Sequence, residues 1–126
     1  MRDLSSNIGP AVSIAPAGNR TADINGSGVD LRDFDSAAVL FQFGTVTDGT
    51  WTPSVEESDD NSSFTAVASD DLVGALSAVT SASDETIQKV SYIGTKRYIR
   101  AVVTETAAST TGAKFSAVIV RGRPHL

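Results

Sequence analysis

The sequence contains no cysteine and a single histidine. Without cysteine the chain cannot form a disulfide, use a thiol as a nucleophile or bind a metal through thiolates. His125 is the penultimate residue, whereas a serine-hydrolase triad needs a histidine that the fold holds between the nucleophile and the acid. We therefore expect a protein that is not an enzyme and that uses no cofactor and no metal.

Long apolar runs are also missing. The longest one, Ala37 to Phe41, is far shorter than the roughly 20 residues that span a bilayer. The first ten residues, MRDLSSNIGP, lack the apolar segment of a signal peptide. These features predict a soluble chain that is not exported by that route and has no membrane partner.

Positive charge is in short supply, and it is unevenly distributed. The formal net charge is −5. Residues 1–60 carry ten carboxylates against three arginines, and residues 61–126 carry five carboxylates against seven lysines and arginines, so the halves have charges of −7 and +2. Proteins that bind nucleic acid neutralise phosphates with lysine and arginine, so this acidic chain is expected to have no nucleic-acid partner.

The length and composition favour one all-β domain. A chain of 126 residues fits a single hydrophobic core. Alanine, valine, serine and threonine are common while leucine, glutamate and lysine are scarce, which favours strands over helices. Short alternating runs separated by turn residues predict a single-domain antiparallel β-sandwich or a jelly-roll-like barrel.

Residues 1–18 have a pattern that excludes a helix, because two glycines and two prolines interrupt it. The apolar residues Ile8, Val12 and Ile14 lie between these breaks. We predict an extended N-terminal arm over residues 1–18 that reaches a neighbouring subunit, followed by the β-sandwich domain over residues 19–126. The alternative for the arm is an edge strand with frayed ends.

Within the sandwich domain, period-two alternation marks the core strands. Val39, Phe41 and Phe43 share one face of a strand, and the apolar Leu40 on the other face predicts that this strand is central and covered on both sides. Trp51 begins a second alternating run, which predicts a half-buried strand.

Turn and capping residues predict the connections. Asn25-Gly26 is the strongest short-range signal for a two-residue hairpin turn. The segment 69–78 is the one helical candidate, because Ser69 can cap it and Asp70 and Asp71 suit a helix N-terminus. We expect at most one short helix there, with a strand as the alternative.

The stretch from Ile87 to Val120 holds three alternating runs, which is typical of a β-meander. A type II′ turn at Gly94-Thr95 would place Lys89 opposite Arg100. One face of this meander then carries four candidate contact residues: Lys89, Lys96, Tyr98 and Arg100.

The like-charge pair on this face requires an anion nearby. Glu56 or Glu57 of the same chain is one source of that charge, and an acidic surface of a partner is the other. The residues alone leave both sources open.

Motifs for carboxylate catalysis, calcium binding and carbohydrate binding are weak in this sequence. Adjacent carboxylates in turns are typical of solvation and turn formation, and the oxygen-rich turn from Glu57 to Asn61 lacks the spacing of an EF-hand. Trp51 and Tyr98 could stack on sugar rings, so a carbohydrate-binding β-sandwich module is the alternative from another functional class.

Four segments carry a resemblance to a known group of proteins: VSYIGTKRYIRAVVTET, KFSAVIVRGRPHL, VDLRDFDSAAVLFQFG and WTPSVEESDDNSSFTAV. With them the chain resembles the small head-associated structural proteins of tailed bacteriophages and of related gene-transfer particles. The resemblance covers nearly the whole chain. Its patterns are those of β proteins more than chemical motifs.

The resemblance implies a cement or decoration protein that is made in the host cytoplasm and then binds the outer surface of an assembled capsid. The major capsid protein is the implied partner, self-association is a further option, and the base of a head spike or fibre at capsid vertices is the alternative role. The family brings no catalytic residues. Our expected capsid contacts are the basic face together with Ile8, Val12, Ile14, Arg121 and Arg123.

Overall fold

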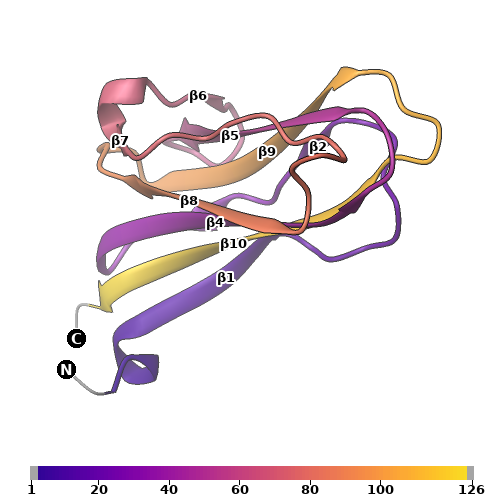
Figure 1. Ribbon diagram of the computed structural model, residues 1–126. Coiled ribbons are helices and arrows are strands. Elements are labelled where there is room, and N and C mark those ends of the chain that lie inside the picture. Colours follow the sequence, from indigo (N-terminus) through magenta and orange to yellow (C-terminus); the bar gives the residue numbers. More distant parts are fainter. Residues whose placement is uncertain (1–2, 125–126) are drawn as a thin grey trace.

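The computed structural model describes residues 3–124, and for Arg123 and Pro124 it describes the backbone alone. The chain folds into two antiparallel sheets that pack as a sandwich, which confirms the predicted all-β class; the barrel does not form (Figure 1). The first sheet contains, in spatial order, β1 (Ile8–Ile14), β10 (Ala113–Pro124), β4 (Phe34–Val46), β8 (Thr86–Tyr92) and β7 (Leu72–Val73). The second contains β2 (Ile24–Asn25), β9 (Tyr98–Ala107), β5 (Thr50–Ser58) and β6 (Thr65–Ala66), and β3 (Val29–Asp30) also pairs with β9.

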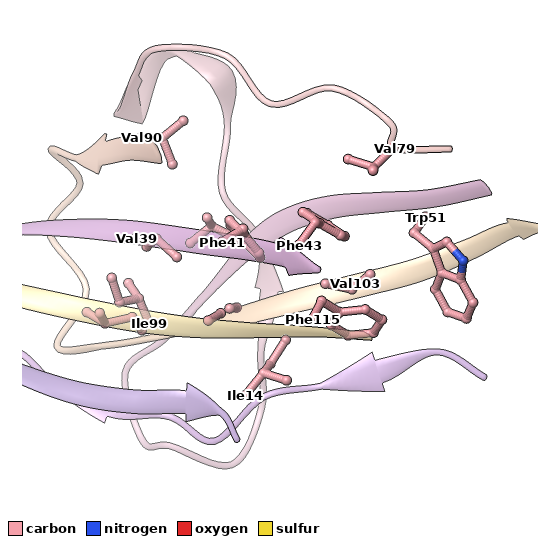
Figure 2. Close-up of a cluster of buried hydrophobic side chains, with 14 of the residues drawn as sticks. Ile14, Val39, Phe41, Phe43, Trp51, Val79, Val90, Ile99, Val103 and Phe115 are labelled. Carbon is pink, nitrogen blue, oxygen red and sulfur yellow. The ribbon is translucent and has the colours of Figure 1, made fainter. Parts of the chain in front are cut away.

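The core lies between the two sheets and follows the predicted alternation. Val39, Phe41 and Phe43 of β4 point inward and are at most 2% exposed, and β4 is the central strand of its sheet, as predicted. Trp51 of β5 is fully buried, and its ring centroid lies 5.5 Å from that of Phe115. Figure 2 shows how these aromatic side chains fill one end of the core.

The chain passes from one sheet to the other at most of its connections, and this corrects the predicted meander. Strand β8 belongs to the first sheet and β9 to the second, so the two do not pair. Gly94 lacks the positive φ that a type II′ turn requires at its first central position. Instead the loop packs on the ring of Tyr92, where a Cβ on Gly94 would lie 2.5 Å from the Tyr92 hydroxyl oxygen.

The predicted hairpin at Asn25-Gly26 is also wrong. Strands β2 and β3 lie one after the other along β9 and do not pair with each other. Neither Asn25 nor Gly26 has the positive φ that a type I′ turn needs. Glycine is required here by close packing instead, because a Cβ on Gly26 would lie 2.4 Å from the hydroxyl oxygen of Ser13.

The segment predicted as an arm forms an edge strand, the alternative considered above. Strand β1 pairs with β10 along its length, from Ile8 opposite Gly122 to Ile14 opposite Ala117. Hydrogen bonding along β10 therefore holds residues 8–14 within the first sheet, and a boundary after residue 18 does not separate them from the sandwich. Pro10, which has no N–H to donate, lies in this strand, and edge strands are where sheets tolerate proline.

The helix predicted over 69–78 shrinks to a single 3-10 turn, η2 (Ser69–Asp71), followed directly by β7. Gly74 has a φ of +108°, which is incompatible with helix continuation. The only other helical turn among residues 3–124 is η1 (Ser5–Asn7).

Ser13 joins the two sheets at a bulge in β1. The pairing register with β10 shifts between Val12 and Ile14, which turns Ser13 towards the second sheet. Its hydroxyl donates to the carbonyl oxygen of Ser27 and accepts from the N–H of Ala101, both at 2.9 Å. The Ala101 N–H is buried, so the Ser13 hydroxyl is the partner that satisfies it.

Asp48 also satisfies backbone N–H groups, in this case between two of the loops that join the sheets. Its carboxylate accepts hydrogen bonds from the backbone N–H groups of Thr110, Thr111 and Gly112, at 2.6 to 3.2 Å. These bonds lower the pKa of Asp48, since they favour its charged form. The loop between β4 and β5 is thereby fixed to the loop between β9 and β10.

We predict that Ser13→Ala lowers the free energy of unfolding by about 1–3 kcal/mol, because it leaves the buried Ala101 N–H without a partner. Urea denaturation followed by tryptophan fluorescence measures the change. Ser91→Ala, at an exposed position of β8, is the matched control and should change stability by less than about 0.5 kcal/mol. Equal midpoints for the two variants would contradict this role of Ser13.

Candidate partner-binding surface

The structure disperses the predicted basic face. Lys89 lies opposite Leu40 in the first sheet, and Arg100 lies opposite Glu56 in the second. The two cations therefore never face each other, because β8 and β9 belong to different sheets.

Arg100 is neutralised within the chain. Its Nε donates to Glu56 Oε1 at 2.8 Å, and its guanidinium carbon lies 4.1 Å from the centroid of the Phe64 ring. Of the two sources of negative charge considered for this residue, the same chain supplies it. The side chain of Arg100 is 21% exposed and is already paired.

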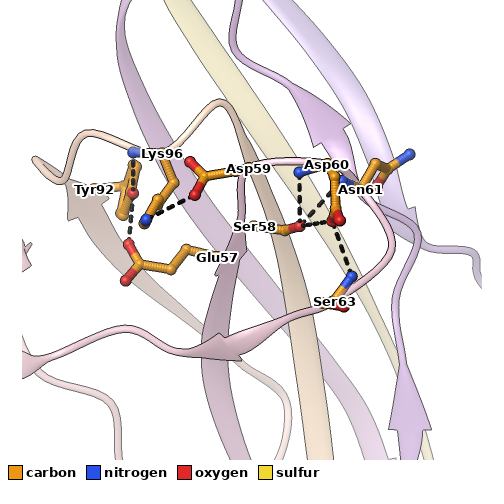
Figure 3. Close-up of polar contacts among 8 residues, drawn as sticks. All are labelled: Glu57, Ser58, Asp59, Asp60, Asn61, Ser63, Tyr92 and Lys96. Atoms are coloured by element: carbon orange, nitrogen blue, oxygen red, sulfur yellow. Dashed lines mark hydrogen bonds and ion pairs between the residues drawn. The ribbon is translucent and has the colours of Figure 1, made fainter.

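Lys96 and Tyr92 take part in a polar network where β8 leaves the first sheet (Figure 3). Lys96 Nζ lies 2.8 Å from Asp59 Oδ2. The Tyr92 hydroxyl donates to Glu57 Oε1 at 2.7 Å and accepts from the backbone N–H of Lys96 at 3.0 Å. Burial raises the pKa of Tyr92, and the hydrogen bond to Glu57 adds to this shift. The network therefore fixes the crossing loop to the strand end of β5.

The oxygen-rich turn after β5 is satisfied by the chain's own N–H groups. Asp60 Oδ1 accepts from the N–H of Ser63 and from the hydroxyl of Ser58 (Figure 3). It also accepts from the N–H of Ser62. These bonds lower the pKa of Asp60. Among residues 3–124, no group of three histidine, aspartate or glutamate side chains is arranged to hold a metal ion.

Four further predicted contact residues occupy different places. Ile14 is 2% exposed and belongs to the core. Tyr98 is half-buried, and the guanidinium carbon of Arg97 lies 5.0 Å from its ring centroid. Arg121 donates to the carbonyl oxygens of Gly9 and Asp30 at 2.9 and 3.0 Å, so it ties β1 to β3. The side chain of Arg123 lies outside the described residues.

Trp51 does not provide a platform for a sugar ring. It is 0% exposed, and its indole N–H donates to the carbonyl oxygen of Asp48 at 3.1 Å. The backbone of Trp51 also exchanges two hydrogen bonds with Val79, at 2.9 and 2.8 Å. Stacking of a carbohydrate on Trp51 and Tyr98 together is thereby excluded.

Three predicted residues do lie on one surface, which we call the outer face: the side of the first sheet that points away from the core. Ile8 and Val12 of β1 and Lys89 of β8 alternate with inward-facing positions and share this side. The apolar members of the outer face are Ile8, Pro10, Val12, Ala38, Leu40, Val73, Ile87, Val118 and Val120.

The outer face is unusually apolar for a surface exposed to water. Val12, Val73 and Ile87 are 54%, 58% and 61% exposed. A shallow hollow lies on it, lined in part by Ala38, Val73 and Val120, where small side chains leave space between larger ones. Contiguous exposed apolar patches on soluble proteins usually mark binding sites.

The cover on both sides that Leu40 predicts for β4 is not found within the described residues, and β10 carries the same signal. Residues 117–120 of β10, Ala-Val-Ile-Val, are apolar on both faces of the strand, as are residues 37–41 of β4. A run that is apolar on both faces indicates cover on both sides. Only one side of β4 and β10 is covered by the second sheet, so the other side is available to a partner.

Comparison with known proteins adds little. No protein-family model matches the chain, and no curated protein matches it. Among solved structures, the crystal structure of the SPBc2 prophage-derived protein YomS has a TM-score of 0.49 and 14% identity, over 91% of this chain and 92% of that one. The structure of infectious bursal disease virus, Gx strain, has a TM-score of 0.42 and 10% identity, over 92% of this chain and 32% of the viral one. Similarity at this level assigns no function to this chain.

None of the helices formed by the described residues is long and apolar enough to cross a membrane.

We predict that Tyr92→Phe reduces the alkaline sensitivity of the fold. Because the folded state raises the pKa of Tyr92 above its ordinary value of 10.0, its contribution to stability is complete below pH 10 and is lost as the pH rises further. The free energy of unfolding, measured by urea denaturation from pH 8 to pH 12, should fall less steeply in the variant than in the wild type. Tyr98→Phe is the control; if it flattened the profile as much, Tyr92 would not be the group responsible.

Proposed function

We propose that this protein is a non-enzymatic structural component of a virion, which binds the outer surface of an assembled capsid through its outer face and stabilises the shell. The observation that carries the proposal is the apolar outer face of the first sheet. The resemblance of the sequence to small head-associated phage proteins supplies the kind of partner, the major capsid protein of the same particle.

The outer face has the chemistry of a protein-binding surface. Burial of apolar area drives association, and Val12, Val73 and Ile87 are more than half exposed in the free chain. Covering one such side chain contributes about 1.5–3 kcal/mol. The other cations considered as contacts, Lys96 and Arg100, are already paired with carboxylates of the same chain and have less to gain from a partner.

The size of the outer face favours an assembled lattice over a single capsid subunit. Four long strands about 4.8 Å apart, each contributing about seven residues, give an area on the order of 450 Å². A standard interface buries roughly 800 Å² on each partner. The outer face alone supplies about half of that area, so contacts made where several capsid subunits meet would complete the interface.

A protein that binds only the assembled shell stabilises it by mass action. Each bound copy lowers the free energy of the shell relative to its free subunits by the binding free energy at that site. A surface built on the paired strands of one sheet suits this role, because little conformational entropy is lost when a preorganised surface binds.

We expect Val12→Ser and Ile87→Ser to weaken binding to assembled capsids roughly tenfold or more each, because each replaces an exposed apolar side chain that the capsid would bury. Co-sedimentation with capsids built from the major capsid protein of the same particle measures the affinity. Ala66→Ser, an exposed apolar-to-polar change on β6 of the second sheet, is the matched control and should bind like the wild type. Loss of binding in the control variant alone would move the interface to the second sheet.

Copy number distinguishes a cement protein from the base of a vertex spike or fibre. A cement protein covers the lattice, so quantitative mass spectrometry of purified particles should find copies comparable in number with the major capsid protein. A spike base is confined to the vertices of a closed shell. A small number of copies per particle would favour the vertex role.

A further inference from the structure

Three cations among residues 3–124 form ion pairs within the chain. Lys96 pairs with Asp59, Arg97 with Asp30 and Arg100 with Glu56, at 2.8, 2.7 and 2.5 Å. Arg97 lowers the pKa of Asp30 to about 2. These pairs place the positive charge of the second sheet and of the crossing loops against the acidic half of the same chain.

Two lysines of the outer face differ from these cations. Lys89 of β8 and Lys114 of β10 are exposed, and neither side chain forms an ion pair or a hydrogen bond with any residue from 3 to 124. Lys114 lies beside Gly44 at one end of the face, since a Cβ on Gly44 would lie 3.6 Å from its Cβ. Lys89 lies opposite Leu40, among the apolar side chains.

The paired positions of the outer face carry no negative charge to balance them. The polar positions that complete it on the paired strands are Ser36, Gln42, Ser91 and Ser116. The chain has fifteen aspartates and glutamates, yet none occupies an outward-facing paired position of β1, β10, β4 or β8 between residues 8–12, 36–42, 87–91 and 116–122. An acidic protein thus presents an apolar face whose paired positions carry no carboxylate, with Glu85 at its rim beside Gln42 and Ile87.

We infer that the outer face recognises an apolar protein surface flanked by carboxylates, and that Lys89 and Lys114 select it by charge. This inference rests on the proposed function and names the chemistry of the capsid surface involved. Complementary charges at an interface steer the encounter and reject wrong partners. An apolar partner surface without carboxylates would leave both lysines partly desolvated and unpaired, which opposes binding.

The same charges argue against a second copy of this chain docked face to face. A two-fold contact places the same surface on both partners. Two outer faces would bring lysines together with no carboxylate at the paired positions between them, and like charges across an interface are unfavourable. Nucleic acid also fits poorly, because two lysines on an apolar surface neutralise few phosphates and the chain carries a net charge of −5.

The hollow on the outer face offers a place for one side chain of the partner. Ala38 and Gly122 are small, and the hollow that they leave lies between Val73 and Val120. An apolar side chain of the partner can enter it, as anchor residues do at the centre of protein interfaces. Ala38→Leu fills this space without changing charge, so it tests apolar insertion separately from the lysines.

The test is co-sedimentation of the full chain with assembled capsids of the same particle, at low and high sodium chloride. Lys89→Glu and Lys114→Glu should each weaken binding by about threefold to tenfold at low salt, and the loss should shrink at high salt as screening increases. Ala38→Leu should weaken binding at both salt concentrations. Arg32→Glu makes the same charge change at an exposed position outside the outer face and should bind like the wild type.

The outcomes separate the inference from the proposed function. If the wild type does not sediment with capsids, the proposed function fails and the inference fails with it. If the wild type binds and both lysine variants bind equally well at low salt, the function stands and charge selection is wrong. Self-association in sedimentation velocity that Ile87→Ser abolishes, or equal lysine-dependent binding to anionic lipid vesicles, would replace the capsid partner with a second copy or a lipid surface and overturn the inference.

Discussion

The fold depends on satisfying the backbone where the chain leaves one sheet for the other. Each crossing removes backbone groups from a strand ladder, and buried N–H groups without partners are costly. Side chains perform this task at three places: the Ser13 hydroxyl at the β1 bulge, the Asp48 carboxylate between two loops, and the Tyr92 hydroxyl after β8. Because these bonds fix the crossings, the inner faces of the two sheets meet in one register and bury the aromatic core.

The sequence predicts which side chains of a strand are buried better than it predicts which strands pair. The alternation of Val39, Phe41 and Phe43 correctly identified an inward face and a central strand, since period-two burial is a local property. Pairing is not local. Gly94-Thr95 has the composition of a hairpin turn, but its glycine is needed to pack against Tyr92, and no sequence pattern reveals which distant ring a glycine must accommodate.

The outer face is predictable from the sequence only in part. The sequence predicts Ile8 and Val12 in an arm and Lys89 in a basic meander, and the structure brings all three to the outer face. Arg100 and Arg121 looked equally available in the sequence. Their neutralisation depends on Glu56 and on two backbone carbonyls that lie far away in the chain, so only the folded structure separates used cations from free ones.

Pro10 gives the edge of the first sheet a property that matters when many copies are crowded together. A row of unpaired donors and acceptors along an edge strand is a template on which another chain can add a strand. Pro10 interrupts that row in β1 because it lacks a donor. Crowded copies of this chain would therefore resist joining edge to edge into one continuous sheet.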